Sequence, residues 1–452
     1  MANHGTMDLT AGRPIRQIFL FSVPLILGTL FQQLYSFVDT VMVGRLIGDT
    51  ALAAVGTTYS LYFLTLGFVS GSCLGFGIPL AQAMGAKDDA EFKRYFWNGV
   101  WMCTLLSIVV TTLMYLLAEP LLRMIHTPED ILPQAARYIR IIFLGIPASV
   151  LYNFSSGALR SAGDSQRPTY FLFATSCLNI VLDYVFIACI PLGVAGAALA
   201  TVLSQLVSGL LNLGWMILKT DLLKNSTGLR GFSRLHAARL CKVGFPMGFD
   251  HSISAMGMVI MQFAINSLGT SAIAGQTTGE KIRQMFTTPM ESVGMGVATY
   301  AGQNQGAKRY DRIRSGIKAG LTIQYIYCVV VWTVIFFGKG SFVAFVLGEN
   351  AGESAVLAVK YLAIISCLFP IHGSLMVVRN TLQGMGYSVH AVFSGVSELV
   401  GRALGSWLSV AFLGFTGICF SNPMAWGCGL IYCAVIYVMV MKRSVQTEKS
   451  VF

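Results

Sequence analysis

The sequence predicts an all-α polytopic membrane protein with twelve transmembrane helices, arranged as two six-helix bundles related by a parallel internal repeat. Three observations lead to this fold class. The 452 residues are 55% hydrophobic and only 11% charged, whereas soluble domains carry about 25% charged residues. Apolar runs long enough to cross a bilayer recur along the whole chain. The second half also repeats landmarks of the first. This composition excludes an ordinary soluble enzyme, a disordered chain and a disulfide scaffold.

Twelve apolar runs, each long enough for a spanning helix of about 20 residues, follow one another between polar residues. They lie at residues 16–43, 51–76, 95–118, 138–159, 168–190, 194–217, 243–267, 271–300, 316–337, 360–382, 389–412 and 416–441. The first run is too long for the h-region of a signal peptide, so we expect it to stay in the mature protein. The 10 cysteines are scattered without metal-ligand spacing and are interpreted as core residues.

The distribution of basic residues predicts the orientation, because short cytoplasmic loops are enriched in Lys and Arg. With the N-terminus inside, the predicted cytoplasmic segments hold 22 of the 31 Lys and Arg residues, and the predicted outer segments hold 6. We therefore expect a multi-pass protein of the cell (inner) membrane with both termini in the cytoplasm. The net charge of +11 follows from this topology, so nucleic acid is not an expected partner.

The longest basic stretch between spans, residues 219–242, divides the chain into six spans and six. We predict an N-terminal bundle over residues 1–218, a cytoplasmic linker over residues 219–242 and a C-terminal bundle over residues 243–452. Because each half holds six spans, both halves have the same orientation. A pseudo-twofold axis along the membrane normal and alternating access around a central cavity are then expected.

The repeat itself is visible as a nearly constant offset between matching residues of the two halves. The tripeptide Gly-Ala-Lys at positions 85–87 recurs at positions 306–308, and Gln82 recurs as Gln303 at the same offset. Farther along, Pro147 recurs as Pro370 at a slightly larger offset. An offset that changes only once indicates internal duplication.

Polar residues at helical spacing mark candidate sites, since a carboxylate at bilayer depth is costly unless it faces water, a partner or an ion. In the first span, Gln32, Tyr35 and Asp39 follow one another at steps of three and four. In the fifth span, Asn179 and Asp183 lie one turn apart. The neighbouring spans add polar stripes of their own: Ser149, Asn153 and Ser156 in the fourth, and Thr201, Gln205, Ser208 and Asn212 in the sixth.

Asp39 and Asp183 are both expected in the outer half of the N-terminal bundle. Two carboxylates, an amide and a hydroxyl supply the hard oxygen ligands that a small cation such as Na⁺ prefers. The same carboxylates, desolvated and close together, could carry a proton instead. The residues themselves leave three interpretations open: a Na⁺ site, a proton site, or acids that serve only in interhelical hydrogen bonds.

The second half does not copy this arrangement. At the repeat offsets Asp39 becomes Ile260 and Asp183 becomes Ser406, so the candidate cation site belongs to the first bundle only. Glu280 starts a separate polar stripe in the eighth span and is either a substrate-binding residue of the cavity or part of an internal ion pair. Glu398 and Arg402 stand four residues apart in the order that favours an ion pair, and we expect them to pair.

Several segments resemble one known family, and together they extend over nearly the whole chain. They are the stretch from Pro24 through Asp39 to Gly44, the motif Asn179-Ile-Val-Leu-Asp183, residues 302–308 (GQNQGAK) and residues 379–386 (RNTLQGMG). These segments are similar to bacterial multidrug and toxic compound extrusion (MATE) transporters, in particular those of the damage-inducible type. The resemblance implies a V-shaped transporter that exports organic cations and other drugs in exchange for Na⁺ or H⁺.

The resemblance also implies roles for individual residues. Cation binding is implied for Asp39, Asn179, Asp183 and Thr201. Substrate contacts are implied for Gln32, Tyr35 and Asn153, to which we add Glu280 from its stripe.

We therefore predict a cation-coupled antiporter rather than an enzyme. It is expected to be a monomer in membrane lipid, with a small-molecule drug or organic cation as substrate and no cofactor beyond the coupling ion, Na⁺ or H⁺. The alternative is a flippase or exporter of a lipid-linked or small metabolite substrate in the same superfamily. An intramembrane enzyme is disfavoured because neither H-E-x-x-H nor G-x-S-x-G occurs in the sequence.

Overall fold

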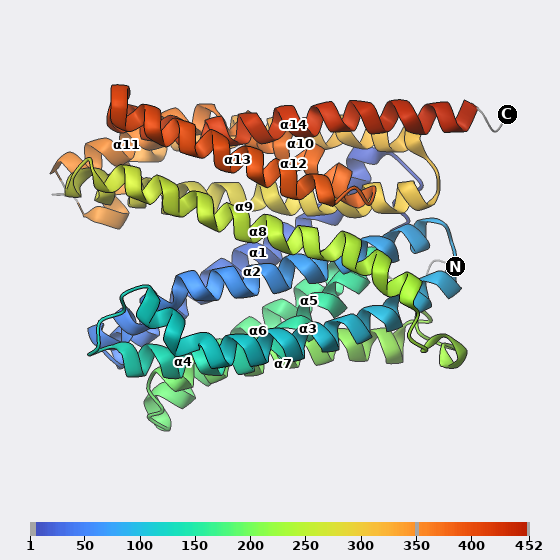
Figure 1. Cartoon of the computed structure of the whole chain (residues 1–452), viewed down its shortest axis with the longest axis horizontal. Helices are drawn as coiled ribbons and strands as arrows, with labels where there is room; N and C mark the ends of the chain where they lie inside the picture. Colours follow the sequence, from blue (N-terminus) through green and yellow to red (C-terminus); the bar gives the residue numbers. More distant parts are fainter. Residues whose placement is uncertain (1–5, 349–351, 450–452) are drawn as a thin grey trace. The chain divides into compact units, whose positions relative to one another are not determined.

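The computed structural model describes residues 6–348 and 352–449, and in these ranges the chain is helical with no β-strand (Figure 1). The helices of the first half are α1 (Pro14–Leu46), α2 (Asp49–Gly85), α3 (Asp89–Met124), α4 (Leu132–Leu144), α5 (Ile146–Ser161), α6 (Gln166–Tyr184) and α7 (Val194–Lys219). Those of the second half are α8 (Arg234–Asn266), α9 (Thr270–Gly306), α10 (Tyr310–Leu347), α11 (Gly352–Cys367), α12 (Phe369–Gly384), α13 (Val389–Leu408) and α14 (Phe415–Lys449).

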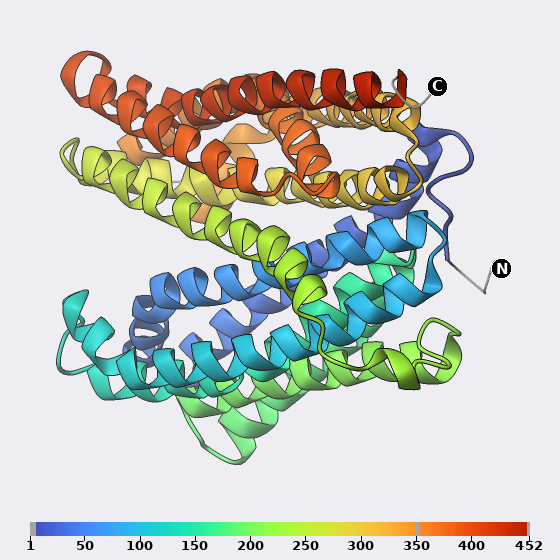
Figure 2. The same cartoon turned by 45° about the vertical axis from the view of Figure 1, so that its right-hand side comes forward.

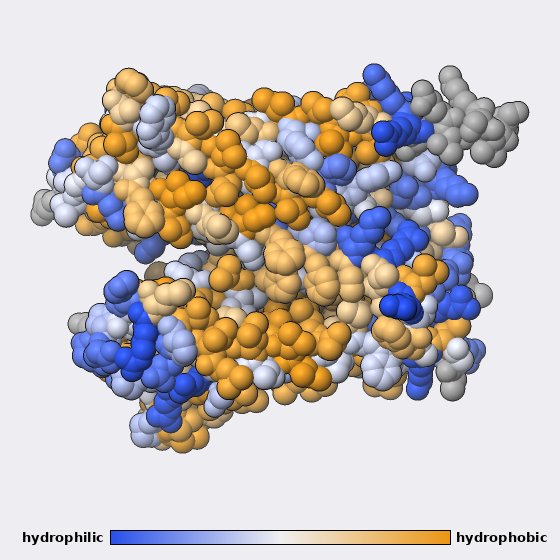
Figure 3. All heavy atoms as spheres, viewed as in Figure 1, coloured by the Kyte–Doolittle hydropathy of each residue, from blue (hydrophilic) through white to orange (hydrophobic). Residues whose placement is uncertain are grey.

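These helices lie where the sequence places the twelve spans. Eight of them are long and apolar enough to cross a membrane, or ten if each of two bent pairs is one span. α8 and α9 carry more polar residues and fall below that measure. With them, and with the bent pairs counted once, the described ranges contain the twelve predicted spans. Figure 3 shows the corresponding surface: hydrophobic side chains cover the middle of the long helices, and hydrophilic ones gather at their ends.

Two spans that the sequence predicts as single helices are broken. The span at residues 138–159 is the pair α4 and α5, bent by 43°, and the span at residues 360–382 is the pair α11 and α12, bent by 50°. The second helix of each pair has a proline, Pro147 or Pro370, in its first turn. Proline lacks the N–H that would bond back to the preceding turn, so the preceding helix cannot continue straight.

A second feature recurs in both halves at the same place. α6 continues into a short π-helix at Val185–Cys189, and α13 continues into another at Ser409–Leu413. After each of them a glycine with positive φ, Gly193 or Gly414, starts the next helix. π-helical turns are often found at functional positions, and the first one directly follows Tyr184, next to Asp183.

The chain divides into two compact units that exchange the beginnings of two helices. Unit 1 comprises residues 1–8 and 27–252, and unit 2 comprises residues 9–26 and 253–452. α1 therefore begins in unit 2 and ends in unit 1, whereas α8 begins in unit 1 and ends in unit 2. This division differs from the predicted boundaries, and the predicted linker 219–242 is already helical from Arg234 onward. Apolar periodicity marks where a helix lies but not which bundle it packs against.

In unit 1, α5 packs against α2 and α7, and α7 also packs against α4 and α6. Small residues allow these close approaches. A Cβ at Gly209 of α7 would lie 2.9 Å from the backbone nitrogen of Tyr152 in α5, and Ser161 of α5 donates to the Gly77 carbonyl of α2 at 2.7 Å. Small residues at helix contacts are typical of membrane proteins, because packing rather than hydrophobicity holds the helices together there.

In unit 2, α13 packs along α14, and α9 packs against α10, α11 and α12 (Figures 1 and 2). The segment before α1 is held on this unit by side chains of α9 and α10. Arg312 donates to the carbonyls of Leu9, Ala11 and Gly12 at 3.2, 3.0 and 2.9 Å, and Gln303 accepts from the Leu9 amide at 3.1 Å.

The segment before α8 and the first turns of α8 are held on unit 1 in a similar way. Asn98 of α3 accepts from the Ser233 amide at 2.7 Å. His236 lies 3.2 Å from a carboxylate oxygen of Glu91, and Arg239 donates to Gln82 at 2.8 Å. Gln82 and Gln303 are equivalent positions of the repeat, so the two units hold the exchanged segments with matching glutamines.

Candidate functional site

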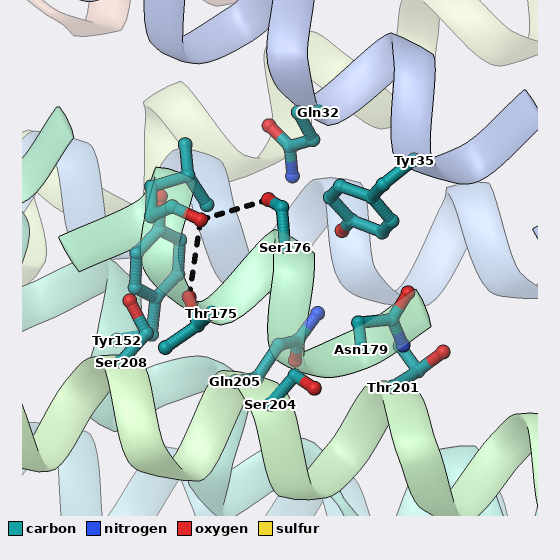
Figure 4. A pocket seen from close by; sticks show the side chains of 11 residues that line it. Gln32, Tyr35, Tyr152, Thr175, Ser176, Asn179, Thr201, Ser204, Gln205 and Ser208 are labelled. Atoms are coloured by element: carbon teal, nitrogen blue, oxygen red, sulfur yellow. Dashed lines mark hydrogen bonds between the residues drawn. The ribbon is translucent and has the colours of Figure 1, made fainter. Parts of the chain in front are cut away.

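Unit 1 contains a pocket between α1, α5, α6 and α7 (Figure 4). Ten of its eleven lining residues are polar or aromatic, and none is charged. They are Gln32, Tyr35, Tyr152, Leu172, Thr175, Ser176, Asn179, Thr201, Ser204, Gln205 and Ser208. Small-molecule sites are typically concave, with a few converging polar groups such as these.

Four of the eight predicted site residues line this pocket together: Gln32, Tyr35, Asn179 and Thr201. Gln32 and Tyr35 come from α1, and the other two come from α6 and α7. In Figure 4 the α7 stripe runs across the view from Ser208 at one end to Thr201 at the end where Asn179 lies. The spacing of three and four residues in the sequence therefore places these side chains around one pocket, on helices that face one another.

Asp183 lies on α6 one turn beyond Asn179 and is completely buried, with 0% of its surface exposed. Neither of its carboxylate oxygens has a hydrogen-bond partner among the described residues. The Asn179 side chain, 1% exposed, also has neither its amide nitrogen nor its oxygen paired within that part of the chain. Buried polar groups are nearly always paired with protein, water or an ion, so these two side chains have hydrogen-bonding atoms that a further ligand would satisfy.

Asp39 completes the acidic end of the site. It follows Tyr35 by one turn of α1, and its Oδ1 atom is buried without a partner in the described ranges. The charge of Asp39 acts on Asp183, and both carboxylates act on the phenol of Tyr138 in α4. Sequence reasoning missed Tyr138, because its helix was predicted as one unbroken span with no polar stripe at that turn.

Asn153 does not line the pocket, although it stands on the same helix as Tyr152. Its Oδ1 accepts from Ser70 of α2 at 3.1 Å, and its Nδ2 donates to the Ser149 carbonyl at 2.8 Å. The predicted substrate residue thus joins α5 to α2. Ser149 itself is hydrogen-bonded to Gln205 across α5 and α7.

Several lining residues were not singled out as site residues from the sequence. Ser176, Gln205 and Ser208 belong to the polar stripes that the helical spacing indicates, so the signal for them was present. Tyr152, Thr175 and Ser204 lie beside those stripes rather than on them. A helical face about 100° wide includes such neighbours. A search for residues spaced only three or four positions apart follows one narrow row and leaves them out.

Glu280 belongs to unit 2 and is engaged by its own neighbours. Arg283 donates to both carboxylate oxygens at 2.6 and 2.9 Å, and the Tyr361 hydroxyl donates at 2.6 Å. The amide of Asn422 lies 3.5 Å from the same carboxylate. Of the two interpretations that the sequence left open, the internal ion pair is the one seen at Glu280.

The expected pair between Glu398 and Arg402 takes a different form. Glu398 accepts from Arg379 of α12 at 2.7 Å, and Arg402 donates to Asn422 at 3.2 Å and to the Ser254 carbonyl at 3.4 Å. Helix spacing brings the two side chains onto one face, but a guanidinium from another helix reaches Glu398 in better geometry. Tertiary contacts therefore decided the pairing.

Comparisons with known proteins agree with this architecture. The MatE family model matches residues 24–185 and again residues 246–408. One match in each half confirms the internal repeat. The probable multidrug resistance protein YpnP of Bacillus subtilis is 30% identical over 416 residues, covering 91% of this chain and 92% of that protein. The multidrug export protein MepA of Staphylococcus aureus is 22% identical over 433 residues, covering 95% of each.

Solved structures show the same fold. A multidrug resistance MATE family transporter in its outward-facing conformation matches with a TM-score of 0.92 at 21% identity, over 98% of this chain and 99% of the other. A MATE structure in complex with the compound MaL6 matches with a TM-score of 0.88 at 22% identity, over 98% and 100%. The family model fits both halves, and the similarity to YpnP extends over nearly the whole of both chains. These findings leave one assignment: this chain belongs to the MatE family of membrane transporters and is not an enzyme.

Proposed function

We propose that this chain is a cation-coupled antiporter that exports organic cations and other drugs by alternating access. One observation carries the proposal: Asp183, one turn beyond the pocket residue Asn179, is completely buried and has no hydrogen-bond partner among the described residues. Asp39 adds a second carboxylate, which is partly buried and whose Oδ1 is unpaired in the same ranges. Burying a carboxylate in a membrane protein is costly. The arrangement is therefore expected only where a cation or a proton compensates the charge during the transport cycle.

The coupling cation binds between Asp39, Asp183, Asn179 and Thr201 in this proposal. The side-chain oxygens of Asp183 and Asn179 accept no hydrogen bond from any described residue. Thr201 adds a hydroxyl at the adjoining edge of the pocket. For Na⁺ these groups supply carboxylate, amide and hydroxyl oxygens, the ligand types that hard cations prefer. For H⁺ the two interacting carboxylates titrate as a pair. Either ion compensates one of the two negative charges when the drug leaves.

The substrate occupies the pocket itself. Gln32, Tyr35 and Tyr152 offer an amide and two aromatic faces, and the hydroxyls of α6 and α7 offer adaptable hydrogen-bond partners. Aromatic faces attract organic cations, and an uncharged lining accepts ligands of varied structure. The names of the relatives, which describe multidrug export, support this substrate class. We further propose that the protein works as a monomer in the cell membrane with both termini in the cytoplasm.

The decisive experiment compares ethidium export by wild type and Asp183→Asn in proteoliposomes with an imposed Na⁺ or H⁺ gradient. Wild-type export should follow one of the two gradients, and Asp183→Asn should lose that dependence because the amide carries no charge for the ion to compensate. Asp221→Asn is the matched control: Asp221 pairs with Lys224 at 2.6 Å outside the helices, and its substitution should leave export unchanged. Gradient-driven export by Asp183→Asn at the wild-type rate would refute the proposal.

A further inference from the structure

A row of polar side chains between α5 and α7 starts in the pocket lining, with Ser204 and Ser208, and continues deeper into unit 1. On α7 the row passes from Ser204 to Ser208 and Asn212 at steps of four residues. Asn212 donates to the Ser156 hydroxyl of α5 at 3.3 Å, and Ser156 in turn interacts with the Tyr152 phenol. From Thr201 to Asn212 the row extends about 17 Å, at about 1.5 Å per residue.

The polar atoms of this row are buried and only partly paired. The hydroxyls of Ser204 and Ser208 and the Oδ1 of Asn212 have no hydrogen-bond partner among residues 6–348 and 352–449. These side chains are 7%, 1% and 0% exposed. Other hydroxyls in the same bundle behave differently, since Thr175 and Ser176 of α6 each donate to the carbonyl of Leu172, as is usual for Ser and Thr in membrane helices.

Unpaired polar atoms in a row have a physical consequence. A buried hydroxyl or amide oxygen without a partner is destabilising, and buried water commonly satisfies such groups when several of them converge. Three groups at successive turns of one helix, joined to the pocket above, provide the partners that a chain of water molecules needs.

Arg160 lies two turns along α5 from Tyr152. It is at the end of the row that is farther from Asp183. Its positive charge acts on the Tyr152 phenol. Within the described part of the chain Arg160 forms no ion pair, whereas Arg167 nearby lies 3.7 Å from Asp164. An uncompensated guanidinium at the end of a polar row is an electrostatic barrier to cations.

We propose that this row is a hydrated ion path inside unit 1. It leads from the Asp39 and Asp183 carboxylates along the pocket-lining residue Ser208 and then past Asn212 toward Arg160. Beyond the pocket it gives the monovalent coupling cation or proton a route of its own, and Arg160 limits leakage through it. The role as a coupling path rests on the proposed function, whereas the hydration of the row does not.

The repeat supports assignment of this path to unit 1 alone. Gly193 and Gly414 start equivalent helices. Aligning these two glycines matches Ser204, Ser208 and Asn212 of α7 with Ala425, Gly429 and Cys433 of α14. The equivalent face of unit 2 is therefore almost without hydrogen-bonding groups. The row coincides with the bundle that carries the carboxylate pair and is missing from the one that does not.

Hydration is tested by the access of Ag⁺, a monovalent cation similar in size to Na⁺, to single cysteines. Asn212→Cys and Ser156→Cys are made separately in a background whose ten native cysteines are replaced. Ala198→Cys is the matched control on α7, because Ala198 is also 0% exposed but lies in the apolar core. After exposure of the intact transporter to Ag⁺, the protein is denatured and the remaining free thiol is labelled with a maleimide, so the readout requires no transport.

Protection of Asn212→Cys and Ser156→Cys by Ag⁺, with Ala198→Cys unprotected, is the expected result. Equal protection of all three, or of none, would overturn the path. Two test positions on different helices keep the result interpretable if one variant does not fold. Should Asp183→Asn retain gradient-driven export while the two cysteines react, the coupling proposal fails but the hydrated row stands. If Asp183→Asn loses gradient-driven export and neither cysteine is protected, the path is refuted and the coupling proposal stands.

The barrier role of Arg160 has its own measurement in proteoliposomes without drug. Arg160→Gln should increase the leak of the coupling ion about tenfold, which corresponds to removing about 1.4 kcal/mol of Coulomb repulsion from the barrier. Arg167→Gln is the control, because Arg167 already has a carboxylate partner. An unchanged leak in Arg160→Gln, or an equal increase in both variants, would show that Arg160 does not limit leakage through the path.

Discussion

At the scale of single residues, the two units differ in whether a buried acid has a hydrogen-bond partner. Asp183 of unit 1 has no protein partner in the described ranges, whereas Glu280 of unit 2 accepts from a guanidinium and a phenol. A carboxylate that is already compensated gains little from a cation. The acid that is left uncompensated is the one suited to bind and release an ion, and this contrast separates site residues from structural ones.

The Glu280–Arg283 pair provides a test of that contrast. Arg283→Met should lower the stability of the protein by about 3 kcal/mol, because it leaves a mostly buried carboxylate without its main partner. In the double variant Glu280→Gln with Arg283→Met, much of this loss should be recovered, since no charge remains to be compensated. Thermal unfolding of purified protein in detergent would measure both changes. A double variant as unstable as Arg283→Met would contradict a structural ion pair.

At the scale of secondary-structure elements, the sequence predicts the helices well and their partners poorly. Apolar runs locate the spans, and Pro147 and Pro370 mark the breaks between α4 and α5 and between α11 and α12. The start of α1 nevertheless belongs to unit 2, and the start of α8 belongs to unit 1. Side chains far along the chain decide this, as the contacts of Arg312 with Leu9, Ala11 and Gly12 illustrate.

The hold of Arg312 on the segment before α1 can be tested directly. Its guanidinium also donates to Asn304, so one side chain fixes four acceptors. Arg312→Gln should release residues 9–12 and speed up hydrogen exchange of the Leu9 amide. In the wild-type protein this amide donates a hydrogen bond to the side-chain oxygen of Gln303. Hydrogen exchange read by mass spectrometry on a peptide covering this segment would measure the change.

A matched control for that variant is Arg309→Gln. Arg309 is exposed and pairs only with Asp311 two residues away, and exposed pairs of this kind contribute little to stability. Exchange at Leu9 should therefore stay at the wild-type rate in Arg309→Gln. If Arg312→Gln exchanged no faster than this control, the guanidinium would not be what holds the segment.

At the scale of the whole molecule, the two halves share their helical framework but differ in their buried polar residues. Both halves keep the bent pairs, the π-helical turns and the glutamines at positions 82 and 303. Only the first half has carboxylates at the positions of Asp39 and Asp183 and the polar stripe of α7. In the second half, Glu280 and Glu398 form internal pairs with arginines instead.

The predicted topology belongs to this scale and has a simple test. Asp130, in the loop between α3 and α4, is expected outside the cell, and Asn225, between α7 and α8, is expected in the cytoplasm. A membrane-impermeant maleimide applied to intact cells should label Asp130→Cys and reach Asn225→Cys only after permeabilisation. Both side chains are exposed, so access to the reagent depends on the side of the membrane alone. The reverse pattern would invert the topology.

The fold class, the twelve spans, the repeat and most of the pocket residues follow from the order of the amino acids, because apolar runs and helical spacing are local properties of the chain. Gln32, Tyr35, Asn179 and Thr201 were within reach of that reasoning. Only the tertiary structure decided that Asn153 joins two helices, that Glu280 is paired and that Glu398 meets Arg379. Which donor reaches a buried acceptor depends on helices distant in sequence, and helical spacing within one span contains no information about them.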